Sequence, residues 1–144
     1  MKILVSACLF GTFCRYDGSA CVNDAVMELA KIYELVPFCP EIYGGLPTPR
    51  EPSEIRNGRV FTRSGKDVTQ EYEKGACEAA RLAQMLGCEM AILQDRSPSC
   101  GVGIIHNGLF DGGLVEGDGV AARHLREAGI RVIRASDTEA LMNI

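Results

Sequence analysis

The sequence predicts an α/β fold, with one domain built on a mainly parallel sheet that helices flank on both faces in a Rossmann-like, three-layer arrangement. Short apolar runs of β type alternate along the chain with helical stretches, which is the pattern of βαβ units. The length of 144 residues suits one compact domain and leaves no room for a second core of ordinary size. We therefore expect residues 1–144 to form a single domain.

Periodicity of apolar residues predicts the elements in the order strand, loop, helix, strand, long loop, helix, strand, loop, helix, strand and short terminal helix. The predicted strands are 3–7, 35–38, 90–93 and 131–133, and the predicted helices are 24–32, 71–86, 120–128 and 137–142. The loop from Glu41 to Val68 is rich in glycine and proline, with a hairpin predicted at Asn57-Gly58. Loops of this length in a small domain are more often functional than idle.

A second glycine-rich stretch runs from Gly101 to Gly119 and ends at the helix 120–128. Glycine lets backbone amides approach a ligand closely, and a helix N-terminus favours negative charge, so phosphate recognition is one interpretation. No Walker-type or dinucleotide glycine spacing accompanies it. The simpler interpretation of Asp118 is that it caps the helix that begins at Val120.

Charge and hydropathy disfavour nucleic-acid and membrane partners, although a local basic patch could still form from Arg15, Arg50, Arg96 and Lys66. The net charge is -4 and the pI is about 5.2, so the chain has no global basic field to hold a nucleic-acid backbone. No segment approaches the roughly 20 apolar residues of a membrane span, and the N-terminal apolar run is too short for a signal peptide. We expect a cytoplasmic protein with no membrane partner. The sequence leaves open whether it forms a homodimer.

Seven cysteines in such a chain do not predict a disulfide framework, because cytoplasmic thiols stay reduced and the number is odd. Cys77 and Cys88 lie in or beside the helix 71–86 and are interpreted as small buried hydrophobes. Cys21 opens the first helix and is also interpreted as structural. The remaining four lie in turns rich in glycine and proline: Cys8, Cys14, Cys39 and Cys100.

Three of these four cysteines, Cys8, Cys39 and Cys100, follow predicted strands. If those strands are parallel neighbours, the three thiols converge on the edge of the sheet where such folds bind small molecules. None of them forms a Cys-x-x-Cys pair, the strong signal for a zinc ribbon. Scattered thiolates suit an iron–sulfur cluster, and three ligands would leave one iron open for substrate. Thiol redox chemistry and plain structural cysteines are the alternatives.

Five uncommon motifs occur in order and span essentially the whole chain. They are Ser6-Ala7-Cys8-Leu9 through Cys14-Arg15-Tyr16-Asp17-Gly18, Phe38-Cys39-Pro40-Glu41, Gly44-Gly45-Leu46-Pro47-Thr48-Pro49-Arg50, Arg96-Ser97-Pro98-Ser99-Cys100-Gly101 and Glu116-Gly117-Asp118-Gly119-Val120. Together they resemble the thiouracil desulfurase (TudS-like) family, formerly a bacterial domain of unknown function. The resemblance implies a single α/β domain with an oxygen-sensitive [4Fe-4S] cluster on three cysteines, whose fourth iron takes the sulfur of a thiolated uracil. The implied reaction is non-redox desulfuration of 2- or 4-thiouracil, or its nucleotide, to the oxo base with release of sulfide.

Carried onto this sequence, the resemblance assigns the cluster ligands to Cys8, Cys39 and Cys100, with Cys14 as an alternative ligand. We prefer the three strand-end thiols because each is held by a rigid sheet element, whereas Cys14 lies farther out along a loop.

The resemblance also matches Glu41 and Ser97 to positions that the family uses for proton movement, since water attacking a thiocarbonyl carbon must lose a proton. Arg50, Arg96 and Ser99 are the substrate-binding candidates, because arginine suits a uracil carbonyl or a phosphate. Each residue also has a structural alternative. Glu41 could pair with Arg50, the serines could bond to their own backbone, and the arginines could pair with surface carboxylates.

His106, in a predicted turn, and His124, on a predicted helix, are interpreted as incidental. Two other function classes remain: a non-catalytic iron–sulfur or zinc-binding module, which predicts four protein thiolates, and a cluster-free nucleoside-binding hydrolase with Glu41 as nucleophile.

Overall fold

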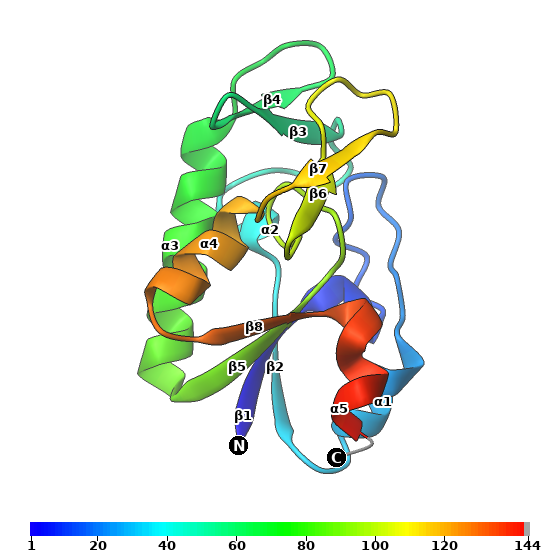
Figure 1. The fold of residues 1–144 in the computed structure, drawn as a ribbon, viewed down its shortest axis with the longest axis vertical. Helices are drawn as coiled ribbons and strands as arrows, with labels where there is room; N and C mark the ends of the chain where they lie inside the picture. Colours follow the sequence, from blue (N-terminus) through cyan, green and yellow to red (C-terminus); the bar gives the residue numbers. More distant parts are fainter. Residues whose placement is uncertain (143–144) are drawn as a thin grey trace.

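Four parallel strands form the central sheet of the computed structural model, which describes residues 1–142 (Figure 1). Their spatial order is β2 (Glu34–Phe38), β1 (Lys2–Ser6), β5 (Cys88–Leu93) and β8 (Arg131–Arg134). Ser6 of β1 pairs with Phe38 of β2, and Val5 pairs with Ile92 of β5. The carboxyl ends of these three strands therefore lie at one edge of the sheet, and the predicted α/β fold is confirmed.

Helices cover both faces of the sheet (Figure 1). Their bounds are α1 Asp24–Leu29, α3 Thr69–Leu86, α4 Val120–Glu127 and α5 Thr138–Met142. Side chains of β1 point alternately to the two faces, so Leu4 packs with Ala83 and Leu125 under α3 and α4, while Ile3 packs with Leu29 of α1. No helix within residues 1–142 is long and apolar enough to cross a membrane.

Two short hairpins lie beyond the edge where the parallel strands end (Figure 1). They are β3 (Ser53–Arg56) with β4 (Arg59–Thr62), and β6 (Ile104–His106) with β7 (Leu114–Glu116). In the first, Asn57 and Gly58 have φ of 52° and 76°, as a two-residue hairpin turn requires, so the predicted Asn57-Gly58 hairpin is confirmed. The sequence pattern does not predict β6, β7 or the one-turn helix α2 (Pro40–Tyr43), because segments of three or four residues are too short to show a period.

The N-terminus of α4 differs from the prediction. Gly119 is the N-cap residue, and Asp118 makes no cap, because its carboxylate accepts from the Gly103 amide at 2.8 Å and pairs with Arg126 at 2.8 Å. The first amides of α4 donate to the carbonyls of the loop after β5, Val120 to Pro98 at 2.8 Å and Ala121 to Ser99 at 2.9 Å. These amides are already bonded within the protein, which argues against the phosphate interpretation of the glycine-rich stretch.

Close approach of two backbones fixes α2 against α3. A Cβ at Gly75 would collide with the carbonyl oxygen of Pro40, and a Cβ at Gly44 would collide with that of Glu71. Glycine is therefore required at both crossing points. This contact holds α2, and with it Glu41, over the carboxyl ends of β1 and β2.

Candidate active site

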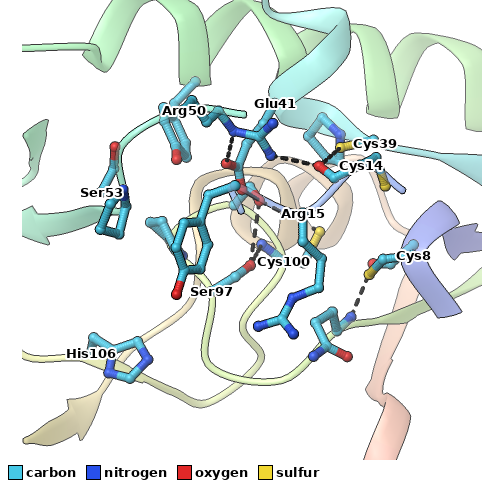
Figure 2. Close-up of a pocket in the computed structure, with 18 of the residues that line it drawn as sticks. Cys8, Cys14, Arg15, Cys39, Glu41, Arg50, Ser53, Ser97, Cys100 and His106 are labelled. Carbon is cyan, nitrogen blue, oxygen red and sulfur yellow. Dashed lines mark hydrogen bonds and ion pairs between the residues drawn. The ribbon is translucent and has the colours of Figure 1, made fainter. Parts of the chain in front are cut away.

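A cavity of about 310 Å³ opens at the carboxyl ends of β1, β2 and β5 (Figure 2). Cys8 lies in the 3₁₀ helix Ala7–Phe10 that follows β1, Cys39 directly follows β2, and Cys100 lies within the loop that connects β5 to β6. All three line the cavity, so the strands bring together the thiols that the sequence places at their ends. Cys14 lines the same cavity and is as deeply buried as Cys8.

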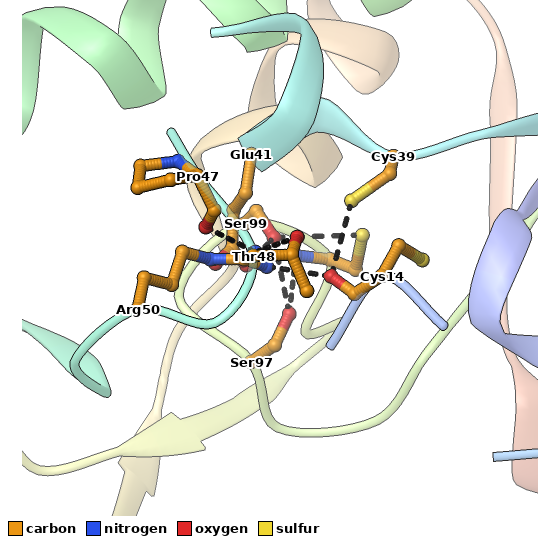
Figure 3. Close-up of polar contacts among 9 residues, drawn as sticks. Cys14, Cys39, Glu41, Pro47, Thr48, Arg50, Ser97 and Ser99 are labelled. Carbon is orange, nitrogen blue, oxygen red and sulfur yellow. Dashed lines mark hydrogen bonds and ion pairs between the residues drawn. The ribbon is translucent and has the colours of Figure 1, made fainter. Parts of the chain in front are cut away.

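The loop that carries Cys14 is held firmly, although it belongs to no helix or strand. The Cys14 carbonyl accepts from Arg50 Nη2 at 2.8 Å and from the Cys39 thiol at 3.9 Å (Figure 3). Its thiol is also close enough to those of Cys8 and Cys39 for each to shift its pKa. Because the Cys14 loop is also held firmly, rigidity does not favour the strand-end thiols over Cys14 as cluster ligands. The choice of ligands stays a prediction.

Interactions among the thiols, together with burial, keep Cys14, Cys39 and Cys100 protonated in the protein alone, because the pKa of each is raised. Burial raises the pKa of Cys100 to about 12, and contact with Cys14, together with burial, raises the pKa of Cys39 well above its usual range. For Cys14, the interaction with Cys39 lowers the pKa, but the interaction with Cys8 and burial outweigh it. The pKa of Cys14 is therefore raised to about 11. Because thiolates are the metal-binding form, a metal centre that binds here must displace protons from the thiols.

The donor set fits a cluster better than a single ion. Within residues 1–142, no three His, Cys, Asp or Glu side chains form a group that could hold one metal ion. An iron–sulfur cluster spans several atoms, so its ligands stand farther apart than the ligands of one ion. Soft thiolates around one cavity are the donors that such clusters use.

A chain of polar contacts runs along the cavity beside the thiols (Figure 3). Arg50 Nε lies 3.0 Å from Glu41 Oε1, and the Ser99 hydroxyl donates to Glu41 Oε2 at 2.7 Å. Ser99 Oγ in turn lies 3.4 Å from Ser97 Oγ and 3.6 Å from the Cys100 sulfur. These contacts therefore link the buried carboxylate of Glu41, through the hydroxyl of Ser99, to Cys100, one of the predicted ligands.

Several of the purely structural contacts that the sequence allows for these residues are observed in the cavity. Glu41 does pair with Arg50, and the two side chains are only 13% and 7% exposed. Ser97 Oγ accepts from the backbone amide of Cys100 at 2.7 Å. Ser99, rather than Ser97, is the hydroxyl bonded to Glu41. Any catalytic role of Ser97 must therefore act through Ser99 or directly on a bound substrate.

The three substrate-binding candidates occupy different places. Ser99 lines the cavity. Arg50 also lines it, but its guanidinium donates to Glu41, the Cys14 carbonyl, Pro47 and Thr48, an arrangement that favours a positioning role. Arg96 lies instead at a neighbouring shallower cavity.

Other residues of the cavity carry no clear signal in the sequence. Tyr72 of α3 is buried beside Glu41. Its burial, and to a lesser extent the negative charge of Glu41, raise the pKa of the Tyr72 hydroxyl well above the usual range.

Arg15 and Arg63 line the cavity and form no ion pair within residues 1–142. His106 ends β6 rather than lying in a turn, lines both cavities, and has a buried Nδ1 with no hydrogen-bond partner among the described residues (Figure 2). Arg15 does stand in the first of the five motifs, next to Cys14, whereas the helical spacing of Tyr72 with Ala76 and Ala79 indicates burial rather than function.

Comparison with known proteins identifies relatives over nearly the whole chain. A family model described as 2-thiouracil desulfurase matches residues 3–137. A Bacillus subtilis (strain 168) protein named "Uncharacterized protein YbbK" is 40% identical over 150 residues, which cover 97% of this chain and 99% of the relative. A solved structure of the [4Fe-4S]-dependent thiouracil desulfidase TudS is 42% identical, with a TM-score of 0.90 and coverage of 99% of both chains. The resemblance that the sequence motifs indicate is confirmed.

The buried ion pair gives a prediction about stability. We expect Arg50→Gln to lower the free energy of unfolding by about 3–5 kcal/mol, because it leaves the Glu41 carboxylate buried without its cation. The matched control is Arg59→Gln, which breaks the exposed pair with Asp67 at 2.7 Å and should lower the free energy of unfolding far less, because solvent screens an exposed pair. Urea denaturation under anaerobic conditions measures both. Equal losses in the two variants would contradict the prediction.

Proposed function

We propose that this chain, which belongs to the 2-thiouracil desulfurase family, is a [4Fe-4S]-dependent thiouracil desulfidase. It would convert a thiolated pyrimidine to the oxo base in a non-redox reaction that releases sulfide, with residues 1–144 acting as one cytoplasmic, cluster-binding domain. The observation that carries the proposal is the convergence of four thiols on one cavity, beside the buried pair of Glu41 and Arg50. The 42% identity to a [4Fe-4S]-dependent thiouracil desulfidase over 99% of the chain supports it.

Cys8, Cys39 and Cys100 are the proposed cluster ligands, with Cys14 as the alternative. When bound by three thiolates, the cluster supplies an iron with a free position that can accept the soft sulfur of a thiocarbonyl and ease its departure. The support for the strand-end set is that its members come from three adjacent parallel strands. The support for Cys14 is that it lines the same cavity and that Cys8 and Cys39 are close enough to its thiol to shift its pKa.

Glu41 is the proposed general base. Replacing a thiocarbonyl sulfur by oxygen takes up one water, whose two protons leave with the sulfide, so a group must first accept a proton from the attacking water. The Glu41 carboxylate lies at the cavity wall with Oε1 fixed by Arg50 and Oε2 by Ser99. Ser99 and Ser97 continue the contact towards Cys100, which offers a path for returning the proton to the departing sulfur.

The cavity suits a small substrate. Its volume of about 310 Å³ lies within the usual range for small-molecule sites. Arg15 and Arg63 on its wall could bind an anionic substituent such as the phosphate of a mononucleotide, in addition to a free base. The net charge of -4 disfavours extended RNA, whose binding needs several phosphate contacts.

A non-catalytic cluster module is the second candidate, and the position of Cys14 favours it. If all four thiols bound the cluster, no iron would remain open and no turnover would follow. The cluster-free hydrolase has less support, because it gives no role to the four thiols that line the cavity beside Glu41.

Anaerobic purification followed by an activity assay tests the proposal. We expect a brown protein that releases sulfide from free thiouracil or its mononucleotide, and faster than from intact thiolated transfer RNA. A cluster with no sulfide release would favour the non-catalytic module. Activity without iron would favour the hydrolase. Faster reaction on transfer RNA would contradict the small-substrate proposal.

The ligand assignment gives a prediction about iron content. Single replacements of Cys8, Cys39 and Cys100 by Ser should abolish cluster retention, measured as iron per folded protein and by visible absorption. Cys88→Ser is the matched control, since Cys88 is also buried but lies at the opposite end of β5 and should keep full iron. Retention in Cys39→Ser together with loss in Cys14→Ser would move the assignment to Cys14.

The proton path gives a prediction about turnover. Glu41→Gln and Ser97→Ala should keep the cluster spectrum but lower turnover at least about 100-fold, because general acid–base help is typically worth about 10²–10⁴-fold. Glu34→Gln, an exposed replacement on β2, is the control and should leave turnover unchanged. Iron content, spectrum and sulfide release are measured on each variant. A near-normal rate in Glu41→Gln with a full cluster would remove Glu41 from the mechanism.

A further inference from the structure

A second group of reactive side chains lies between α3 and α4, outside the lining of the cavity. Glu73 and Cys77 stand one turn apart on α3, and His124 belongs to α4. The Cys77 sulfur lies 3.9 Å from His124 Nδ1, while Nε2 of the same ring lies 2.6 Å from Glu73 Oε2. His124 therefore bridges a thiol and a carboxylate.

Cys77 faces solvent, so the expectation that it is a small buried hydrophobe is wrong. Its helical position beside Ala76 and Ala80 indicates burial, but α4 covers Ala76 and leaves Cys77 at the margin of the helix contact. All seven cysteines lie within residues 1–142, and among them only Cys77 is exposed, while Cys88 is buried as expected.

The carboxylate of Glu73 is held at both oxygens. Oε1 accepts from Arg123 Nη2 at 2.8 Å, and Oε2 faces His124. When Nε2–H donates to Glu73, the lone pair of His124 lies on Nδ1 and faces the thiol. A nucleophile within reach of a base, with that base oriented by a third group, is the arrangement that activates catalytic cysteines.

We propose that Cys77 is an activated nucleophilic thiol and a site of reversible modification by low-molecular-weight disulfides, separate from the desulfuration site. His124 takes the thiol proton, and the Cys77 sulfur attacks one sulfur of the disulfide R–S–S–R. A Cys77–S–S–R bond forms as the original S–S bond breaks, and the departing thiolate RS⁻ takes the proton from His124. Cys77 is oxidised and half of the disulfide is reduced, so the disulfide is the only co-reactant.

The exposed position of Cys77 determines which reagents can reach its sulfur. Cys77 lies on the outer surface of two packed helices, where a small, flexible disulfide can reach its sulfur from solvent. Cys21 provides the internal comparison, because it is partly buried and its sulfur contacts Gln94 Nε2 at 3.5 Å rather than a histidine. The structure therefore predicts that Cys77 reacts ahead of Cys21.

The test uses the anaerobic holoenzyme and hydroxyethyl disulfide, with peptide mass mapping to locate the mixed disulfide. We expect modification at Cys77 first, reversed by dithiothreitol. His124→Gln and Glu73→Gln should each slow modification of Cys77 by at least about tenfold, a threshold set below the roughly 100-fold low end of general-base effects. Arg81→Gln is the control on the same helix, because Arg81 pairs with Glu78 at 2.7 Å and not with Glu73.

Circular dichroism and cluster absorption check that each variant is folded, and iodoacetamide supplies a second rate for the same thiol. Cys77→Ser should keep desulfidase turnover, which separates this site from the cavity. A rate at Cys77 equal to that at Cys21 would overturn the proposal. So would an unchanged rate in both folded variants, His124→Gln and Glu73→Gln.

Discussion

The buried guanidinium of Arg50 is the contact on which the cavity depends. It binds Glu41 Oε1 at 3.0 Å and the Cys14 carbonyl at 2.8 Å, and so joins the segment after β1 to the helix after β2. Taking a guanidinium and a carboxylate out of water costs several kcal/mol each, and only complete pairing offsets that penalty. Displacement of either segment would leave a charge or a carbonyl unpaired. The positions of the carboxylate and of the Cys14 loop are therefore coupled through one side chain.

Close backbone contacts supply the rest of the framework. Glycine at positions 44 and 75 lets α2 lie directly on α3, and Gly119 has a similar role at α4, where a Cβ would stand 2.6 Å from the backbone of Ser99. The Ser99 carbonyl accepts from the first turn of α4 while its hydroxyl donates to Glu41 at 2.7 Å. A rigid helix thus holds the backbone of the residue whose side chain orients the carboxylate, which is how a functional group keeps its geometry.

Sequence patterns predict the parts of this site that follow from regular structure. Parallel neighbouring strands place Cys8, Cys39 and Cys100 at one edge, so their convergence needs no knowledge of side-chain contacts. The place of Cys14 depends on Arg50, which lies 36 positions away in the sequence, and no local pattern reports such a contact. Asp118 is not a cap for the same reason, since the Gly103 amide and Arg126 compete for its carboxylate.

The chemistry of a cysteine in this protein is decided by what surrounds it rather than by its place in a motif. Burial raises the pKa of Cys100 to about 12, which suits its proposed role as a ligand that loses its proton only to a strong cationic centre. Cys77 is exposed and has an imidazole oriented by a carboxylate, the surroundings that favour attack on a disulfide. Ligand thiols gain from shielding, because an exposed sulfur is open to exchange and oxidation, whereas a nucleophile must reach its partner. The fold separates these opposite needs by placing one set at the end of the sheet and the other outside, between α3 and α4.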